Sequence, residues 1–191
     1  PGEASGLVPS REWKRQAFSN RGTSEQNWYP SDTEQISIGQ GFHQMTLIQL
    51  AQAYAAIANK GTIYKPQIVK EIEAPDGTVV FRAVPEIAYE VEAKQSTWDA
   101  LAEVMKAPIT HARGTARSTM AGAGYTMAGK TGTWEVPGSV SNGLYVGYAP
   151  AENPEILVAV VVERGGGGSS SAAPIARKIL DAYFQRDIPD T

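Results

Sequence analysis

The sequence predicts an α+β fold, an α/β sandwich in which helices flank an antiparallel sheet. Three observations support this prediction. The last third of the chain alternates apolar strand patterns with turn signals and ends in a helical pattern. Two amphipathic helical patterns precede those strands. The 191 residues are 42% hydrophobic and 19% charged, which is the balance of a globular chain large enough for one core.

The first third of the chain predicts a short helix and then a long one. Residues 1–35 are polar and rich in turn residues, and Ser10 is placed to cap the short helix. The long helix follows Thr46, which forms a capping box with Gln49, and it ends at Gly61. Its apolar face consists of Leu47, Leu50, Ala51, Tyr54, Ile57 and Ala58.

The middle of the chain predicts short strands and another helix. Residues 63–69 form a short strand that a proline interrupts, which indicates an edge strand. An Asp-Gly pair at 76–77 between two apolar runs indicates a hairpin. The second helix covers about residues 97–106, with Ser96 as its cap and Pro108 as the residue that stops it.

The last third predicts the sheet. Strands are expected at 127–134, 144–148 and 156–162, and seven consecutive apolar residues indicate that the last of them is buried on both faces. The composition of the Gly-Ser run at 165–171 is that of a flexible linker, but the run is interpreted as a surface loop because both of its flanks are strongly structured. A final helix opens near Pro174. Its apolar stripe consists of Ile175, Ile179, Leu180, Tyr183 and Phe184.

Composition disfavours several classes of site. Without cysteine, the chain has neither disulfides nor a thiolate metal site. Its two histidines, His43 and His111, lie apart, so we expect no metal and no cofactor. A net charge of -3 argues against nucleic acid as a partner. No apolar run approaches the roughly 20 residues that a membrane helix needs.

The most informative segment is Gly129, Lys130, Thr131, Gly132, Thr133 and Trp134. It combines an ammonium group, two hydroxyls and a glycine that lets a substrate backbone come close. A strand edge of this composition binds a carboxylate and offers an N–H to a developing oxyanion. Lys-Thr-Gly is also one of three motifs of serine penicillin-recognising enzymes.

Two alternatives compete for this segment. Residues 124–131 fit the phosphate-binding pattern G-x-x-x-x-G-K-[ST]. Such a loop follows a buried strand and opens a helix, whereas here small residues precede it and Gly132, Pro137 and Gly138 follow. The other alternative is an ordinary polar strand end without a function.

The rest of the chain resembles the class B penicillin-binding proteins of the elongation type. The resemblance covers nearly all 191 residues and rests on the order and spacing of several elements. They include Trp-Tyr-Pro-Ser-Asp-Thr at 28–33, Ser-Ile-Gly-Gln-Gly at 37–41, Gly-Thr-Ala at 114–116 and Gly-Tyr-Ala-Pro at 147–150, together with residues 2–10, 13–14, 46–51, 59–61 and 66 and the helix at 174–184.

The resemblance implies the penicillin-binding transpeptidase/serine β-lactamase-like fold, incomplete in this chain. It implies a peptidoglycan D,D-transpeptidase that cross-links stem peptides ending in D-Ala-D-Ala through an acyl-serine, and that β-lactams acylate. Lys130 would support the proton network, and the hydroxyls of Thr131 and Thr133 would bind the terminal carboxylate. The N–H of Thr133 would donate to the oxyanion. Beside Gly132, Trp134 would wall the cleft or simply pack.

The nucleophile motif of that family is absent. The sequence holds neither Ser-x-x-Lys nor Ser-x-Asn; Ser10 and Lys14 are one residue too far apart, and Ser141 and Asn142 lack the spacer. We therefore expect residues 1–191 to be the C-terminal portion of a single transpeptidase domain. The upstream portion would supply the nucleophile, the general base and a membrane anchor, and this chain alone would be inactive.

The resemblance also suggests partners and a location. The partners are the stem peptide, β-lactams, the upstream fragment of the same protein and a membrane glycan polymerase. The location is the outer face of the bacterial cytoplasmic membrane, on the periplasmic side, where such proteins serve cell-wall synthesis and cell shape. A non-catalytic transpeptidase-like scaffold or sensor module is the alternative function, and a serine β-lactamase also shares Lys-Thr-Gly.

Overall fold

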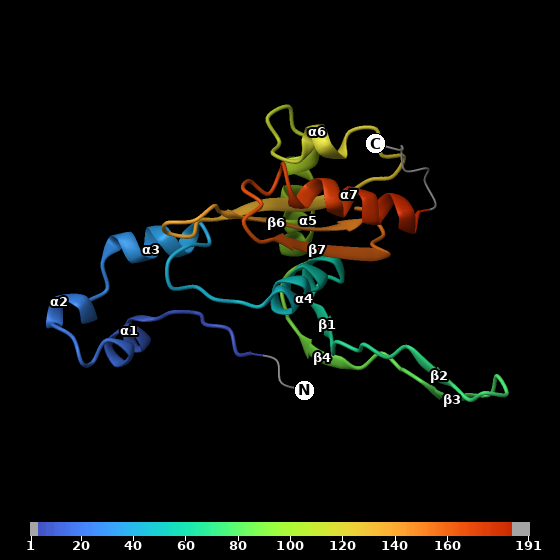
Figure 1. Cartoon of the computed structure of the whole chain (residues 1–191), viewed down its shortest axis with the longest axis horizontal. Helices are drawn as coiled ribbons and strands as arrows, with labels where there is room; N and C mark the ends of the chain where they lie inside the picture. The colour runs from blue at the N-terminus through green and yellow to red at the C-terminus, as the bar shows by residue number, and fades with distance from the viewer. Residues whose placement is uncertain (1–3, 185–191) are drawn as a thin grey trace. The chain divides into compact units, whose positions relative to one another are not determined.

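The computed structural model describes residues 4–184, so Gly2 and Glu3 of the first resembling element lie outside the described residues. The chain divides into two compact units, one that ends at Leu50 and one that begins at Ala51 (Figure 1). Within residues 4–50 the first unit contains three helices and the start of a fourth. The second contains the sheet and the segment predicted as the site.

The helices of the first unit are α1 (Arg11–Ala17), α2 (Thr23–Gln26) and α3 (Pro30–Ser37). Ser10 caps α1 as predicted, because its Oγ accepts a hydrogen bond from the N–H of Trp13 at 3.1 Å. The sequence prediction missed α2 and α3. For α3 a signal was present, since Pro30 occupies the first turn, where a missing N–H costs nothing.

A buried ion pair links α1 to α3 in the first unit. The Nζ of Lys14 donates to Asp32 Oδ2 at 2.6 Å and lies 5.3 Å from the ring centroids of Tyr29 and Phe42. Lys14 is 6% exposed, so the charge needs these partners. Burial works against ionisation of Asp32, but hydrogen bonds from Lys14 and the N–H of Tyr29 outweigh it and lower the pKa of this carboxyl.

Helix α4 (Leu47–Ala58) has the predicted capping box. The N–H of Thr46 donates to Gln49 Oε1 at 2.9 Å, and the N–H of Gln49 donates to Thr46 Oγ1 at 3.2 Å. The chain leaves the helix at Gly61, whose φ is 109°. A Cβ at Gly61 would lie 2.4 Å from the carbonyl oxygen of Val91, so this position requires glycine for space as well as for conformation.

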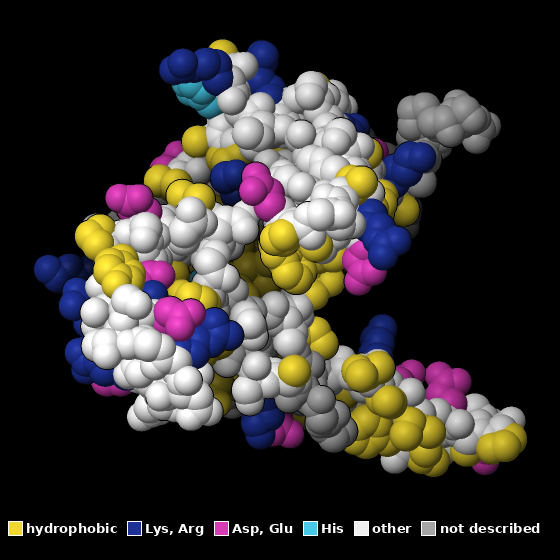
Figure 2. All heavy atoms as spheres, turned by 60° about the vertical axis from the view of Figure 1, so that its left-hand side comes forward, with side chains coloured by type: hydrophobic (Ala, Val, Ile, Leu, Met, Phe, Trp, Pro, Cys, Tyr) yellow, Lys and Arg dark blue, Asp and Glu magenta, His cyan; other side chains and the backbone are white. Residues whose placement is uncertain are grey.

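Two antiparallel ribbons follow: β1 (Thr62–Tyr64) with β4 (Ile87–Glu90), and β2 (Glu71–Glu73) with β3 (Val79–Arg82). The predicted Asp-Gly hairpin is confirmed, and the N–H of Thr78 donates to Asp76 Oδ1 at 2.9 Å. The first predicted strand is shorter than expected and ends before Pro66, which has no N–H to donate. Strand β4 was not predicted. Apolar side chains, among them Val80 and Phe81, are exposed along the hairpin (Figure 2).

Helix α5 (Gln95–Thr110) is longer at both ends than predicted. Ser96 does not cap it, and Pro108 lies inside it rather than stopping it. Pro108 stands in the last turn, where the missing N–H frees only one carbonyl of the preceding turn, so the helix continues for two more residues. The short helix α6 (Arg117–Met120) follows.

The main sheet is antiparallel, with β5 (Ala128–Trp134), β6 (Asn142–Ala149) and β7 (Ile156–Val162) in the order β5-β6-β7. Its register pairs Thr131 with Tyr145 and Tyr145 with Val160. The prediction that β7 is buried on both faces was wrong, since Val158 is its buried residue and Val161 is 42% exposed. Strand β7 is an edge strand in the described part of the chain, which is why its apolar run is only half-covered.

Helix α7 (Ala172–Tyr183) covers one face of the sheet (Figure 1). The core on this face includes Tyr145, Ala149, Val158, Ala173, Ala176 and Leu180. The predicted stripe of α7 was only partly right, because Ile175, Ile179 and Tyr183 are between 43% and 49% exposed. Alanines make the contact instead, since their small side chains let the helix backbone approach the strands.

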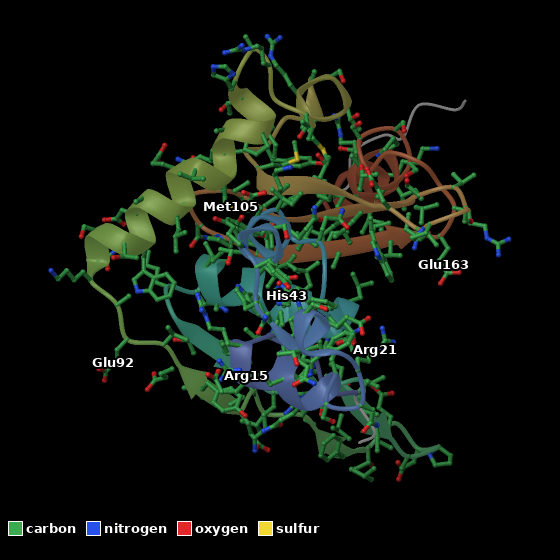
Figure 3. All side chains as sticks on the ribbon, turned by 90° about the vertical axis from the view of Figure 1, so that its left-hand side faces the viewer. Arg15, Arg21, His43, Glu92, Met105 and Glu163 are labelled. Atoms are coloured by element: carbon green, nitrogen blue, oxygen red, sulfur yellow. The ribbon has the colours of Figure 1, made fainter. Side chains whose placement is uncertain are left out.

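A second cluster covers the opposite face. Ala128, Tyr148 and Ala151 are buried there against Ala58 of α4 and Met105 of α5 (Figure 3). The sheet of the second unit is therefore packed with helices on both faces. This arrangement confirms the predicted α+β sandwich and places β5 at the margin of its core.

Candidate active site

Strand β5 is an outer strand of the three-stranded sheet. Within residues 4–184 no other strand pairs with its second edge. Alternate residues of a strand point to opposite faces, and here Ala128 belongs to the cluster around Met105 whereas Thr131 faces Thr115. Lys130 and Trp134 therefore share the face of Ala128, and Thr133 shares that of Thr131.

Lys130 is exposed, although its neighbours Gly129 and Thr131 in β5 are buried. Its Nζ donates to the carbonyl oxygen of Thr131 at 2.6 Å, so the side chain curls along the strand. A lysine ammonium carries three donors, and this contact uses one of them. The group can therefore still bind an anion at the edge of the sheet.

Thr131 is 7% exposed, and its hydroxyl bonds to that of Thr115 at 2.7 Å. The sequence pattern predicted Thr131 as a carboxylate ligand but did not identify Thr115 as its partner. The two residues are separated by 16 positions, and only the fold brings them together.

Thr133 is held from the side of α7. Its Oγ1 accepts a hydrogen bond from the N–H of Gly168 at 3.4 Å. A Cβ at Gly168 would lie 2.2 Å from the carbonyl oxygen of Gly132 and 2.3 Å from that of Leu144, so this loop lies directly on the strands. The predicted Gly-Ser surface loop is therefore a loop, but it supports the segment that carries the motif.

The remaining residues of the segment differ in exposure. Trp134 is 62% exposed and Gly132 is half-buried. A Cβ at Gly132 would lie 3.2 Å from a methyl carbon of Leu144, which is a tight but not prohibitive contact. Gly132 thus leaves the strand surface low between Lys130 and Trp134, on the face that these two residues share.

The phosphate-binding alternative was wrong. Lys130 and Thr131 lie within β5, which continues as a strand to Trp134. A phosphate-binding loop needs a helix N-terminus at this point, because the helix supplies the N–H groups and the dipole that hold the phosphate. No such helix begins between Lys130 and the end of the strand.

A buried network ties α7 to the connection that leads into β5. The hydroxyl of Tyr125 donates to Asp181 Oδ1 at 2.7 Å, and Arg177 Nε donates to both carboxylate oxygens of Asp181 at 2.8 and 2.7 Å. Arg177 also donates to the carbonyl oxygen of Ala121 at 2.8 Å. Burial and the nearby Asp181 carboxylate raise the pKa of Tyr125. The spacing of four residues between Arg177 and Asp181 in a helix is a sequence signal that could have indicated this ion pair.

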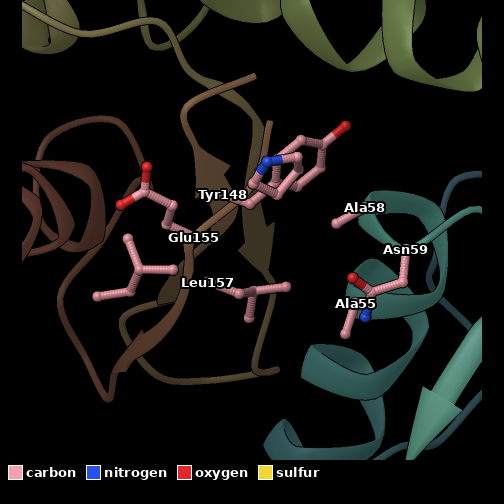
Figure 4. Close-up of a pocket in the computed structure, with 8 residues that line it drawn as sticks. Ala55, Ala58, Asn59, Tyr148, Glu155 and Leu157 are labelled. Atoms are coloured by element: carbon pink, nitrogen blue, oxygen red, sulfur yellow. The ribbon is translucent and has the colours of Figure 1, made fainter. Parts of the chain in front are cut away.

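A small pocket of about 140 Å³ lies between α4 and the end of the sheet (Figure 4). Lys130 is not among its lining residues, which are Ala55, Ala58, Asn59, Tyr148, Pro154, Glu155, Ile156 and Leu157. Among residues 4–184 no group of three or more His, Asp or Glu side chains is placed to hold a metal ion. In the same range, no helix combines the length and the apolar character needed to cross a bilayer.

An antiparallel sheet packed with helices, with Lys-Thr-Gly on an outer strand, defines the class of serine penicillin-recognising proteins. Known proteins place the chain within this class. The family model described as "Penicillin binding protein transpeptidase domain" matches residues 1–181. The chain belongs to the penicillin-binding protein transpeptidase family.

Its relatives confirm the elongation-type resemblance. The peptidoglycan D,D-transpeptidase MrdA of Haemophilus influenzae is 33% identical over 204 residues, which cover 98% of this chain and 30% of the relative. Pseudomonas aeruginosa PBP2, solved in complex with WCK 5153, superposes with a TM-score of 0.75 at 44% identity, covering 95% of this chain and 39% of that one.

Helicobacter pylori PBP2, solved in complex with MreC, has a TM-score of 0.78 at 26% identity. The match covers 97% of this chain and 32% of that one. The chain thus spans less than half the length of each of these relatives.

Proposed function

We propose that this chain is part of a peptidoglycan D,D-transpeptidase that cross-links stem peptides through an acyl-serine. It supplies the Lys-Thr-Gly wall of the substrate groove, as the C-terminal portion of a single transpeptidase domain. One observation carries the proposal: in a chain of the transpeptidase family, the motif lies on an outer strand with Lys130 accessible.

The substrate is an extended peptide that ends in D-Ala-D-Ala. An extended peptide adds to a sheet edge through main-chain hydrogen bonds, and the low surface at Gly132 gives it room. The terminal carboxylate binds at the free edge of β5, which the ammonium of Lys130 reaches from one face of the strand and the hydroxyls of Thr131 and Thr133 reach from the other. Charge-assisted hydrogen bonds of this kind are roughly twice as strong as neutral ones.

The N–H of Thr133 is our candidate for one oxyanion donor. Residues two apart in a strand turn their backbone groups to the same edge. The carbonyl of Thr131 accepts a bond from the Lys130 ammonium, so that edge is within reach of the exposed side chain. The N–H of Thr133 turns the same way. A donor fixed in the backbone stabilises the developing charge without reorganising.

The nucleophile is a serine of a Ser-x-x-Lys segment outside these 191 residues. Its oxygen attacks the carbonyl of the penultimate D-alanine, and the terminal D-alanine leaves as an amine. An acceptor amine then attacks the acyl-serine and releases the serine. Covalent catalysis of this kind divides one difficult step into two easier ones. The reaction with a β-lactam stops at the acyl-serine.

The proposed location is the periplasmic side of the bacterial cytoplasmic membrane, with an anchor upstream of this chain. A membrane glycan polymerase is the proposed partner. A protein of the MreC kind is a further candidate, since a relative was solved in complex with MreC. The second candidate function is a non-catalytic scaffold or sensor. The sequence upstream of this chain distinguishes the two functions, since Ser-x-x-Lys there means an enzyme and its absence there means a scaffold.

Labelling with fluorescent penicillin tests the proposal. The complete protein is expected to take up one label per molecule, and excess unlabelled penicillin is expected to block it. The 191-residue chain alone is expected to take up none. If the complete protein takes up no label, the scaffold or sensor function is supported. If the isolated 191-residue chain is labelled covalently and stoichiometrically, the nucleophile does not lie in an upstream segment.

A further inference from the structure

We propose that Thr115 completes the carboxylate site of β5. It holds the hydroxyl of Thr131, and the pair presents one proton to the terminal carboxylate of the substrate. This inference rests on the proposed transpeptidase function and adds a specificity residue to it. By sequence, Thr115 belongs only to the Gly-Thr-Ala element at 114–116.

The inference starts from the hydrogen bond between the two hydroxyls. Thr131 Oγ1 and Thr115 Oγ1 are 2.7 Å apart. Each hydroxyl has one proton, and the shared bond uses one of the two. The pair therefore retains one proton for a further acceptor. Thr131 is 7% exposed whereas Thr115 is exposed, so this proton is available on the solvent side of the pair.

The backbone around Thr115 is fixed by the end of α5. The N–H of Ala116 donates to the carbonyl oxygen of Pro108 at 3.0 Å. A Cβ at Gly114 would lie 2.3 Å from that same oxygen, so only glycine lets the chain fold back so closely. Ala116 is fully buried. A residue held on both sides in this way presents its hydroxyl in one place.

The charge of the surrounding sequence suits an anion. The stretch from residue 104 to residue 134 contains no Asp or Glu, and it carries four basic residues: Lys106, Arg113, Arg117 and Lys130. Arg113 and Arg117 flank Thr115 and are exposed. A neutral donor pair in such a stretch offers a carboxylate a proton without repelling it.

The test compares two penicillins that differ only in the carboxylate. The second-order rate constant for acylation is measured in the complete protein for benzylpenicillin and for its methyl ester. The ratio of the two constants reports recognition of the carboxylate, whereas general damage to the fold lowers both together. We expect the unaltered protein to prefer the free acid.

Thr115→Val removes the hydroxyl and keeps the shape. It is expected to lower the ratio about tenfold, the effect of losing one hydrogen bond to a charged group. Thr115→Ser keeps the hydroxyl and is expected to retain the ratio within about twofold. Thr97→Val, at an exposed position on α5, is the control and is expected to change nothing. If valine prevents folding, Thr115→Ala gives the same comparison.

The outcomes separate the two proposals. If neither compound acylates the unaltered protein, the transpeptidase function is wrong. If the unaltered protein prefers the free acid and Thr115→Val has the same preference, the role of Thr115 is wrong. Loss of the preference in Thr115→Ser, which still has a hydroxyl, also overturns it.

Discussion

The glycine loop that lies on β5 leads to a sharp prediction, because two adjacent glycines differ in the space around them. A Cβ at Gly168 would meet two strand carbonyl oxygens at 2.2 and 2.3 Å. A Cβ at Gly167 would meet the hydroxyl oxygen of Ser170 at 3.5 Å, which is an ordinary contact. Gly168→Ala should therefore be harmful and Gly167→Ala harmless.

The magnitude follows from what has to move. Both oxygens near Gly168 belong to the backbone of the central sheet, so the loop must retreat from the strands rather than a side chain rotate. Overpacking of this kind costs about 1–3 kcal/mol. Replacing glycine also restricts the unfolded chain, which stabilises both variants by about 0.4–1 kcal/mol. We expect a net loss of about 1–2 kcal/mol for Gly168→Ala and a slight gain for Gly167→Ala.

Thermal unfolding of the domain in the complete protein measures the difference. For roughly 150 to 250 residues, 1 kcal/mol corresponds to about 2–4 °C in Tm. Gly168→Ala should melt about 2–8 °C lower and, because Thr133 loses the N–H of Gly168, it should also acylate more slowly. If the two alanine variants melt at the same temperature, the loop does not press on the strands and the reasoning is refuted.

Three further predictions concern single side chains. Lys130→Ala should slow acylation of the complete protein at least tenfold, which corresponds to a loss of about 1.4 kcal/mol in transition-state stabilisation. The control Lys70→Ala, at an exposed position, should not slow acylation. Equal acylation rates for the two variants would show that Lys130 is not part of the site. Tyr145→Phe should leave the free energy of unfolding unchanged or raise it by up to about 1 kcal/mol, because the buried hydroxyl of Tyr145 has no hydrogen-bond partner among residues 4–184. A loss of more than about 1 kcal/mol in denaturant unfolding contradicts this. The pKa of Asp32 lies below its ordinary 3.8 despite burial, because Lys14 and the N–H of Tyr29 donate hydrogen bonds to the carboxylate. Asp32 therefore stabilises the fold above pH 3.8, and this contribution is lost as the pH falls below that value. Asp32→Asn should flatten this part of the curve of stability against pH, and an unchanged slope would contradict the role of Asp32.

The local elements of the fold were predictable because their signals lie in neighbouring residues. The capping box of Thr46 and Gln49, the cap at Ser10 and the Asp-Gly hairpin all appear where the pattern put them. Strand β5 was also located to within a residue. The errors concern burial: β7 is half-covered, and α7 packs through its alanines rather than its larger side chains.

The candidate site divides in the same way. The motif residues 130–134 were identified from their composition, and their edge position follows from the strand order. Thr115 and Gly168 were not identified, since neither has a local pattern that marks it. The first contacts Thr131 and the second contacts Thr133 across 16 and 35 positions of the chain.

The sequence by itself determined the kind of elements, the motif and the family resemblance, because periodicity, caps and turn residues act over a few positions. Only the tertiary structure decided which faces are covered and which side chains meet at β5. Burial and hydrogen bonding at the threonines depend on segments far away in sequence, and no pattern within one segment records the surface against which it will pack.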